Sequence, residues 1–274
     1  MTRSHWTPPP ERGGRATPAG LYDALLGGEF NLPADRELAA KALEVIPAMA
    51  KMAKTSRAFL RRAVRHFANE GFDQFLDLGS GIPATGNVHE IAQAHRPDAR
   101  VVYVDIHPVA VMTGQQILRD NPDAVAILGD ARNPDAVLAD EELNRVVDLN
   151  RPVVLLAVAL LHYLTDDDRP YEAMARLRER LAPGSVLVLA HGARESYAES
   201  QTQKIQTAFR ESEAPKPVVR SYDEVLGFFG DFQLIDPGLV WLPQWRPELG
   251  PDDPDWFVSD PVQSGSLAGA AQKL

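Results

Sequence analysis

The sequence predicts an α/β protein with a doubly wound, mostly parallel sheet of seven strands, an antiparallel strand at its C-terminal edge and a helical extension in front of it. From residue 75 onward, short apolar runs alternate with helical stretches at the spacing of parallel βαβ units. These runs are apolar along most of their length, which is typical of strands buried on both faces. Before residue 70 the pattern is helical only. With 274 residues, 45% of them hydrophobic, the chain can bury the core that such a sheet requires.

The part of the chain before the sheet divides into a lead-in and a helical extension. Residues 1–16 lack the apolar core of a signal peptide, and their composition predicts a disordered segment. Thr17 followed by Pro18 is typical of a helix N-terminus, and a glycine pair at 27–28 ends that helix. The expected organisation is a lead-in over 1–16, a helical cap over 17–70 with helices at 17–27, 33–46 and 47–69, and a core over 71–274.

The strands and helices of the expected core alternate regularly until about residue 191. A Pro- and Asp-rich segment then follows the sixth expected strand. A late strand pair that is joined by a loop and not by a helical crossover predicts antiparallel pairing at the edge of the sheet. Strands are expected at residues 74–78, 100–105, 124–128, 152–158, 185–191, 232–243 and 266–272, and helical stretches at 83–95, 108–119, 132–140, 168–181, 198–212 and 221–229.

The stretch FLDLGSGIPATGN joins the first expected strand to the next helix. Gly79, Ser80 and Gly81 carry no bulky side chain, and Pro83 is typical of a first helical position. A tight glycine turn before a helix N-terminus leaves free N–H groups that can face a ligand. An ordinary strand-to-helix turn has the same pattern, so the residues around it decide between the two interpretations.

Three aspartates lie at the ends of neighbouring strands, where open α/β sheets bind their ligands. Asp77 lies in the first strand, Asp105 ends the second and Asp130 follows the third. A carboxylate after the second strand can accept hydrogen bonds from ribose hydroxyls, and one after the third can accept from an exocyclic amine of adenine. Each aspartate alone is also compatible with a helix cap or a surface position. The register of all three favours a nucleoside site.

The order of these motifs resembles that of class I S-adenosylmethionine-dependent methyltransferases. The matching motifs are FLDLGSG, VVYVD, LGDA, LLAVALLHYL and LAPGSVLVLAHG. The stretches LYDALLGGEFNLPADRE, RAFLRRAV, GNVHEIAQ and GLVWLPQWRP are similar to a narrower group, the actinobacterial S-adenosyl methyltransferase family formerly catalogued as a domain of unknown function. The resemblance covers the chain from about Thr17 onward. It implies a Rossmann-like core and S-adenosylmethionine as cofactor, and it implies no particular acceptor.

The resemblance also implies roles for residues at the carboxyl ends of the strands. Asp77 would orient the ammonium group of the cofactor, Asp105 would hold its ribose, and Ile106 would pack on its adenine. The other residues assigned to the cofactor are Gly79, Ser80 and Gly81 at its amino-acid part, Asp130 and Ala131 at the edge of the adenine, and Ala159 after the fourth strand.

The helical extension is expected to cover the cofactor. A glycine pair separates its first two helices, and polar side chains lie beside this break, which is unusual in a plain connector. Tyr22 and Asn31 are expected to fold over the open side of the cofactor pocket. Arg57 is expected to pair with the carboxylate of the cofactor as a fork-shaped donor. The alternative is that these helices only pad one edge of the sheet.

Two other functions are compatible with the same motifs. Residues 79–84, GSGIPA, also satisfy the pattern G-x-G-x-x-G/A, and Asp105 follows at roughly the distance expected of an NAD(P)-dependent oxidoreductase. Asp77 counts against this alternative, because a carboxylate there would repel the pyrophosphate. The second alternative is a catalytically silent S-adenosylmethionine-binding protein, since a fold does not establish chemistry.

Catalysis of methyl transfer requires little beyond alignment and exclusion of water, because the reaction is an in-line displacement at a carbon activated by positive sulfur. A general base would help if the acceptor is a hydroxyl or an amine. His162, Tyr163 and His191 lie at the ends of the fourth and fifth strands, and each is also compatible with a packing role. No metal is expected, because the histidines lack a ligand spacing and TDDDR is typical of a helix cap.

Composition limits the partners of the protein. The net charge of -10 disfavours nucleic acid, and the absence of cysteine excludes disulfides and thiolate metal sites. The longest apolar run, 152–161, is too short to span a membrane. A cytoplasmic enzyme with a small-molecule acceptor is therefore expected, and the oligomeric state is not indicated. One basic cluster is interpreted as a solvated stripe on an amphipathic helix: Arg57, Arg61, Arg62, Arg65 and His66.

Overall fold

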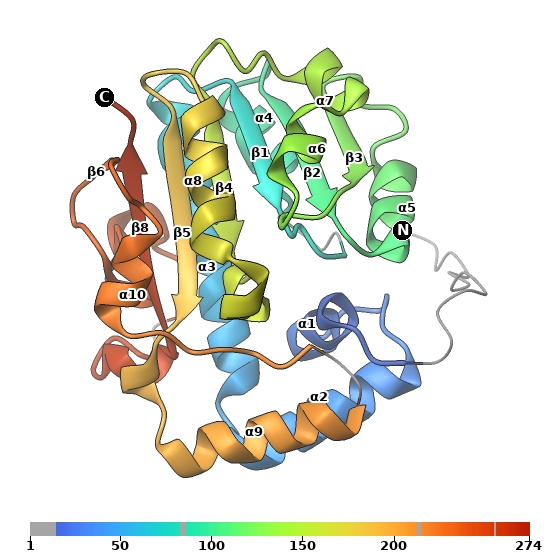
Figure 1. Cartoon of the computed structure of the whole chain (residues 1–274), viewed down its shortest axis with the longest axis vertical. Helices are drawn as coiled ribbons and strands as arrows, with labels where there is room; N and C mark the ends of the chain where they lie inside the picture. The colour runs from blue at the N-terminus through green and yellow to red at the C-terminus, as the bar shows by residue number, and fades with distance from the viewer. Residues whose placement is uncertain (1–14, 83–85, 213–214, 255) are drawn as a thin grey trace.

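The computed structural model describes residues 15–82, 86–212, 215–254 and 256–274 and contains an eight-stranded sheet (Figure 1). The strands are β1 (Gln74–Leu78), β2 (Arg100–Asp105), β3 (Ala124–Leu128), β4 (Val154–Val158), β5 (Val186–Gly192), β6 (Gln233–Leu234), β7 (Val240–Trp241) and β8 (Ser266–Gln272). Their order is β3-β2-β1-β4-β5-β8-β6, and β7 also pairs with β8. The strands β1 to β5 are parallel, and β8 is antiparallel to β5. The predicted mostly parallel sheet with an antiparallel edge is confirmed.

Helices cover both faces of this sheet. They are α1 (Pro18–Leu26), α2 (Pro33–Val45), α3 (Met49–Asn69), α4 (Val88–His95), α5 (Pro108–Ile117), α6 (Pro134–Leu138), α7 (Glu141–Val146), α8 (Pro170–Arg180), α9 (Glu199–Ser212) and α10 (Tyr222–Gly227). Because successive strand residues point to opposite faces, Leu76 and Phe75 belong to different apolar clusters. The cluster of Leu76 includes residues of α6, α7, α8 and α10, and that of Phe75 includes residues of α3, α4 and α5. Figure 1 shows α8 in front of the sheet and α3 behind it. None of the helices in these ranges is long and apolar enough to cross a membrane.

A third apolar cluster lies beyond the carboxyl ends of the parallel strands and forms a cap of α1, α2, the start of α3, and α9 (Figure 1). This division differs from the expected units at 17–70 and 71–274. Ala53 of α3 packs in the cap cluster, whereas Phe59 of the same helix packs in a cluster with residues of the sheet. The helix α9 comes from the C-terminal half of the chain and also packs in the cap cluster. Residues 1–14 of the expected lead-in are outside the described residues, and Ala16 packs in the cap.

Three differences from the sequence prediction change the number of elements or move the start of one by several residues. The single strand expected at 232–243 is interrupted by a turn in which the Gly238 N–H donates to the Ile235 carbonyl at 2.8 Å, so two short strands replace one and the sheet has eight strands. In the sheet, β8 lies between β5 and these two short strands. The helix expected from Pro83 begins at Val88, and residues 83–85 lie outside the described residues. The helix α7 was not predicted.

The basic cluster of α3 is not a solvated stripe, and that interpretation was wrong. Arg62 is 3% exposed; its Nε donates to the Trp245 carbonyl at 2.9 Å, its Nη2 to the Leu242 carbonyl at 2.7 Å, and its Nη1 pairs with Asp253 at 2.5 Å. Arg61 also pairs with Asp253, and Arg65 donates to the Leu249 carbonyl. These bonds hold residues 242–253 against the helix.

Candidate functional site

A cavity of about 490 Å³ lies between the carboxyl ends of the parallel strands and the cap. Its first wall consists of the loops that follow β1, β2, β3 and β4, and its second wall consists of α1, the start of α3, α9 and residues 215–219. Figure 1 shows β1, β2 and β5 pointing toward α1 and α9. Ligands of open α/β sheets bind at this end of the strands, so the cavity is the candidate active site.

The glycine turn after β1 forms the floor of this cavity. Gly79 has φ of +65°, and a Cβ there would lie 2.5 Å from Leu160 Cδ1, so the approach of the loop after β4 requires glycine. The N–H groups of Gly79 and Ser80 donate to the Val104 carbonyl at 2.8 and 3.1 Å, and that of Gly81 to Asp105 Oδ2 at 2.8 Å. These three N–H groups are therefore occupied, contrary to the prediction that the turn leaves them free.

The N-terminus of α4 is also occupied by a group of the chain. Glu90 Oε2 accepts hydrogen bonds from the N–H groups of Gly86 at 2.9 Å and Asn87 at 2.8 Å. A dinucleotide places its pyrophosphate on free N–H groups at this position of the fold. A carboxylate that already fills the position counts against the oxidoreductase alternative.

Asp77 is a buried carboxylate that faces the cavity without a hydrogen-bond donor among the described residues. Burial raises the pKa of Asp77 to about 7, although the nearby charge of Arg57 lowers it. A buried carboxylate without a partner carries a large desolvation cost, and a cationic ligand removes much of that cost. The position therefore suits an ammonium group.

Arg57 places a cation at the same end of the cavity. Its Nη2 donates to the Gly86 carbonyl at 3.2 Å and to Asn87 Oδ1 at 3.3 Å. Its Nε is buried and has no hydrogen-bond partner among the described residues. A guanidinium edge with an unused donor suits a carboxylate, which accepts two parallel hydrogen bonds from such a fork.

The predicted ribose and adenine residues also line the cavity. Asp105 accepts hydrogen bonds from the backbone N–H groups of Gly81 and His107, each at 2.8 Å, which fixes the orientation of its carboxylate. Ile106 is 48% exposed beside it and lines the cavity, so its apolar side chain is available to pack on a ligand. Asp130 lies next to Ala131 and pairs with Arg132 at 2.7 Å.

The two cap residues that were expected to cover the cofactor have different positions in the structure. Tyr22 lines the cavity, and its hydroxyl donates to the Ala53 carbonyl at 3.1 Å. Asn31 does not line it. Its Nδ2 donates to Asp23 at 2.8 Å and to the Gly28 carbonyl at 2.7 Å, so Asn31 stabilises the joint between α1 and α2. The expectation that Asn31 faces the cofactor is not met.

The loop after β4 brings two of the three candidate catalytic residues to the cavity. This loop begins at Ala159, a non-glycine residue with φ of +58° that lines the cavity, and continues as the 3-10 helix η2 (Leu161–Tyr163). His162 and Tyr163 both line the cavity, and their side chains have no hydrogen-bond partner among the described residues. Burial, with smaller contributions from His191 and Arg220, lowers the pKa of His162 to about 3. The imidazole of His162 is therefore neutral at physiological pH.

His191 is not among the residues that line the cavity. Its Nε2 lies 3.0 Å from Arg220 Nη1, and its Nδ1 lies 2.9 Å from the Gly192 carbonyl. Because arginine can only donate, Nε2 must accept and Nδ1 must carry the proton. No lone pair remains to accept a substrate proton, so the expectation that His191 is a general base is not met.

Sequence reasoning missed two features of the site. Arg220 is buried and donates to the Leu161 and Leu164 carbonyls at 3.3 and 3.0 Å, which holds the loop that carries His162. No local pattern marks this residue. The cavity wall formed by α9 could have been predicted, because Ile205, Ala208 and Phe209 recur at helical spacing in an otherwise polar stretch of the sequence.

In the described part of the chain, no three His, Cys, Asp or Glu residues form a group that could hold a metal ion.

Comparisons with known proteins were made for the whole chain. The sequence model of the S-adenosyl methyltransferase family matches residues 5–273. A crystal structure of a candidate methyltransferase from Thermobifida fusca YX is 38% identical, with a TM-score of 0.89 over 98% of this chain and 99% of that one. A DUF574 family protein from Streptomyces avermitilis MA-4680 is 32% identical, with a TM-score of 0.86 over 95% and 98% of the two chains. A search of curated proteins found no match.

A more distant solved structure has the same fold. The plantazolicin methyltransferase BpumL, solved with a triazolic desmethylPZN analog and S-adenosylhomocysteine, is 12% identical. Its TM-score is 0.53, and the match covers 93% of this chain and 95% of that one. At this identity the similarity concerns the fold alone.

Proposed function

The chain belongs to the S-adenosyl methyltransferase family, and we propose that it transfers a methyl group from S-adenosylmethionine to a small-molecule acceptor by in-line displacement. The family resemblance in the sequence is thereby confirmed, and the protein is a methyltransferase. One observation carries the assignment of its cofactor site. Asp77 and Arg57 present a carboxylate and a guanidinium with unused hydrogen-bonding capacity to one cavity. The amino-acid end of S-adenosylmethionine has the two complementary charges.

In this proposal the remaining residues hold the nucleoside end of the cofactor. The carboxylate of Asp105 accepts from the ribose hydroxyls, and Ile106 packs on the adenine. The turn of Gly79, Ser80 and Gly81 lets the amino-acid part approach the backbone closely, because no side chain intervenes. Asp130 and Ala131 contact the edge of the adenine, and Ala159 lies near the reacting sulfur. Tyr22 covers the cofactor from the side of the cap.

The cofactor supplies a methyl group activated by positively charged sulfur. The protein then needs to align the acceptor with that group and to exclude water. The cap forms the second wall of the cavity and so covers the site from one side. The free ring nitrogen of His162 can accept a hydrogen bond from the acceptor, and Arg220 positions the loop that carries it.

A thermal-shift measurement tests the cofactor assignment. S-adenosylmethionine and S-adenosylhomocysteine are expected to raise the melting temperature, since a ligand at 100 times its Kd stabilises the fold by about 2.7 kcal/mol. NAD is expected to have no effect at the same concentration. A shift with NAD and none with S-adenosylhomocysteine would contradict the proposal. A protein that binds the cofactor but releases no S-adenosylhomocysteine with any acceptor in a broad panel would be a silent binder.

A further inference from the structure

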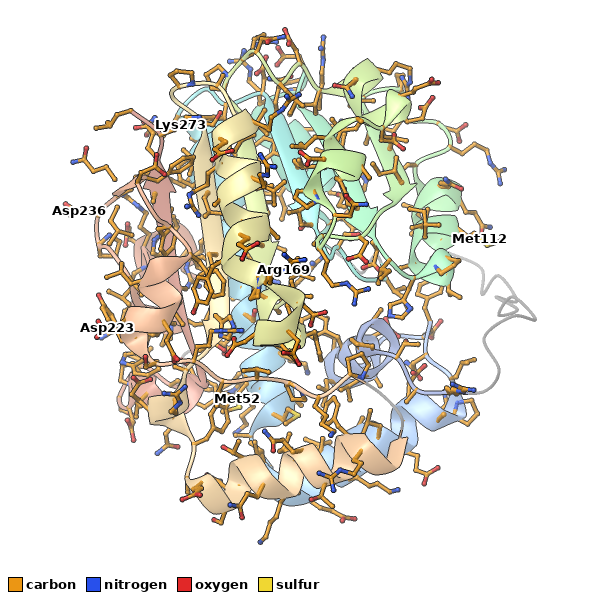
Figure 2. The ribbon with its side chains drawn as sticks, in the orientation of Figure 1. Met52, Met112, Arg169, Asp223, Asp236 and Lys273 are labelled. Atoms are coloured by element: carbon orange, nitrogen blue, oxygen red, sulfur yellow. The ribbon has the colours of Figure 1, made fainter. Side chains whose placement is uncertain are left out.

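The cavity extends past the cofactor residues into a chamber inside the cap. Leu25 of α1, Ile46 before α3, Met49 and Met52 of α3, and Ile205 and Phe209 of α9 line it and belong to one apolar cluster. Figure 2 labels Met52 on the lower part of α3, near α9. Side chains that line a space make fewer contacts than side chains that fill it, so this arrangement costs free energy unless a ligand supplies the missing contacts.

Hydrogen-bonding groups also line the cavity beside the apolar cluster. Tyr163 and Tyr197 pack against the apolar cluster and line the cavity, and His162 contacts the ring of Tyr163 at a centroid distance of 4.2 Å. Among the described residues, no hydrogen-bond partner is found for the two phenol oxygens or for the ring nitrogens of His162. Tyr22 differs, because its hydroxyl is already used on the Ala53 carbonyl. Donors and acceptors therefore remain available for one polar group of a ligand.

Charged groups are nearly absent from the chamber. Among the described cavity-lining residues of α1, the first turn of α3, α9 and 215–219, Lys216 is the only charged one. The carboxylates of the cavity lie at the carboxyl ends of the strands and in the loops that follow them. A charged acceptor would lose its hydration in the chamber. An ammonium group would find no carboxylate there to offset that loss, and an anion would find only Lys216, whose side chain is exposed.

The neutral state of His162 follows from its surroundings. The guanidinium of Arg220 lies 3.0 Å from His191, and the His191 ring lies 6.1 Å from the His162 ring. Burial is the main cause of the lowered pKa of His162, and the fixed positive charge behind the histidine pair lowers it further. His162 therefore has a ring nitrogen that can accept a hydrogen bond from a neutral hydroxyl.

We infer that the methyl acceptor is an uncharged, largely apolar aromatic molecule whose hydroxyl group binds at His162, Tyr163 and Tyr197. The inference rests on the proposed function, because it assigns the second half of the same cavity. Aromatic and methionine side chains on the walls favour a flat ring over a flexible polar chain.

Three probes with the same ring system test the inference on the unaltered protein. We propose to titrate 2-naphthol, 2-naphthoate and naphthalene into the full-length protein at about pH 7, with and without saturating S-adenosylhomocysteine, and to follow binding by fluorescence. The naphthol is expected to bind at least about tenfold more tightly than the naphthoate, because only the naphthoate is charged, and also more tightly than naphthalene. Equal or tighter binding of the naphthoate would overturn the inference.

Variants locate the binding site in the chamber. Ile205→Glu places a carboxylate in its wall and is expected to weaken naphthol binding at least about tenfold, whereas Thr207→Glu adds the same charge on the exposed side of α9 and is expected to leave it unchanged. Tyr163→Phe keeps the ring and removes the hydroxyl, so it is expected to reduce the preference for naphthol over naphthalene. Naphthol binding that neither Ile205→Glu nor Tyr163→Phe alters would overturn the inference. A separate titration of S-adenosylhomocysteine reports on the proposed function alone.

Discussion

Arg57 and Arg62 lie five positions apart on α3 and have opposite surroundings. Each of the three guanidinium nitrogens of Arg62 donates a hydrogen bond, two of them to backbone carbonyls and one to Asp253. Arg57 keeps a buried Nε without a partner among the described residues and faces the cavity. The difference distinguishes two uses of one residue type. A buried cation whose donors are all satisfied by the chain stabilises the fold, whereas one with an unused donor is prepared for a ligand.

The same distinction separates two buried aspartates. Asp35 accepts hydrogen bonds from the backbone N–H groups of Thr17 at 2.8 Å and Leu32 at 2.7 Å, and it closes the joint between the cap helices. Asp77 has no donor among the described residues and faces the cavity. Counting all buried charged residues would therefore assign too many residues to the binding site. Buried charged groups that lack a hydrogen-bond partner identify the site better.

Replacing Arg62 with alanine is expected to give the largest effect. The change leaves the Leu242 and Trp245 carbonyls and Asp253 without their main donor, which is expected to lower the free energy of unfolding by about 3 kcal/mol. Urea denaturation measures this change. Arg61→Ala is the control, because Arg61 is partly exposed and makes one ion pair, and its cost is expected to stay below about 1 kcal/mol. Equal costs for the two variants would show that burial and the two backbone carbonyls add nothing to the contribution of Arg62.

Replacing Arg57 with alanine is expected to act on binding and not on stability. Loss of a charge-assisted hydrogen bond to the carboxylate of S-adenosylhomocysteine is expected to reduce affinity by about 1.5–3 kcal/mol, or roughly 10- to 100-fold. Calorimetric titration measures the affinity. Arg57→Lys keeps the charge and removes the planar fork, so it is expected to recover part of the loss. Full affinity in Arg57→Ala would show that Arg57 has no contact with the cofactor.

The sequence predicted the part of the fold that depends on local patterns. Buried parallel strands are apolar along most of their length, so β1 and β2 and the connections between them could be located from the sequence. The strand expected at 232–243 could not be divided correctly, because its interruption depends on a turn and on pairing with β8. Residues 242–253 are held by arginines about 180 positions away, and no local pattern contains that information.

The residues of the candidate site could also be predicted only in part from the sequence. Asp77, Asp105 and Asp130 were found because they end neighbouring strands, and the topology of the sheet brings such residues together. Asn31 was expected in the same cavity because it is polar and lies beside a helix break. Its side chain is used within that break, by Asp23 and the Gly28 carbonyl. His191 could not be separated from His162 by sequence, because the difference depends on Arg220.

The pH dependence of cofactor binding sharpens the contrast between the aspartates. Burial raises the pKa of Asp77 to about 7, so the fold favours its protonated form. Its contribution to stability is therefore present below pH ~4 and is lost as the pH rises toward about 7. An ammonium group binds the ionised form, so the affinity for S-adenosylhomocysteine is expected to rise roughly tenfold between about pH 6 and pH 7.5.

Asp77→Asn tests the assignment of this titration. The variant is expected to bind S-adenosylhomocysteine more weakly, with little change over the same pH interval, and to lose less stability between about pH 4 and pH 7. Calorimetry at the two pH values and urea denaturation measure the two effects. If the variant keeps the pH dependence of the parent protein, the titrating group is a different one, and Asp77 does not face the ammonium group.

Arg132→Ala is expected to give the smallest effect. Partial burial tends to raise the pKa of Asp130, but its hydrogen bonds with Arg132 lower it overall, so this carboxylate is ionised with or without a cofactor. The pair is substantially exposed, and such pairs contribute less than about 1 kcal/mol to stability. Removing Arg132 frees Asp130 to accept a hydrogen bond from the adenine amine, so the affinity for S-adenosylhomocysteine is expected to stay within about threefold of the parent or to increase. Calorimetry measures it, with Arg145→Ala, which breaks an exposed pair on α7, as the control. A loss of more than about tenfold would mean that Arg132 itself contacts the cofactor and that the satisfied pair belongs to the binding site.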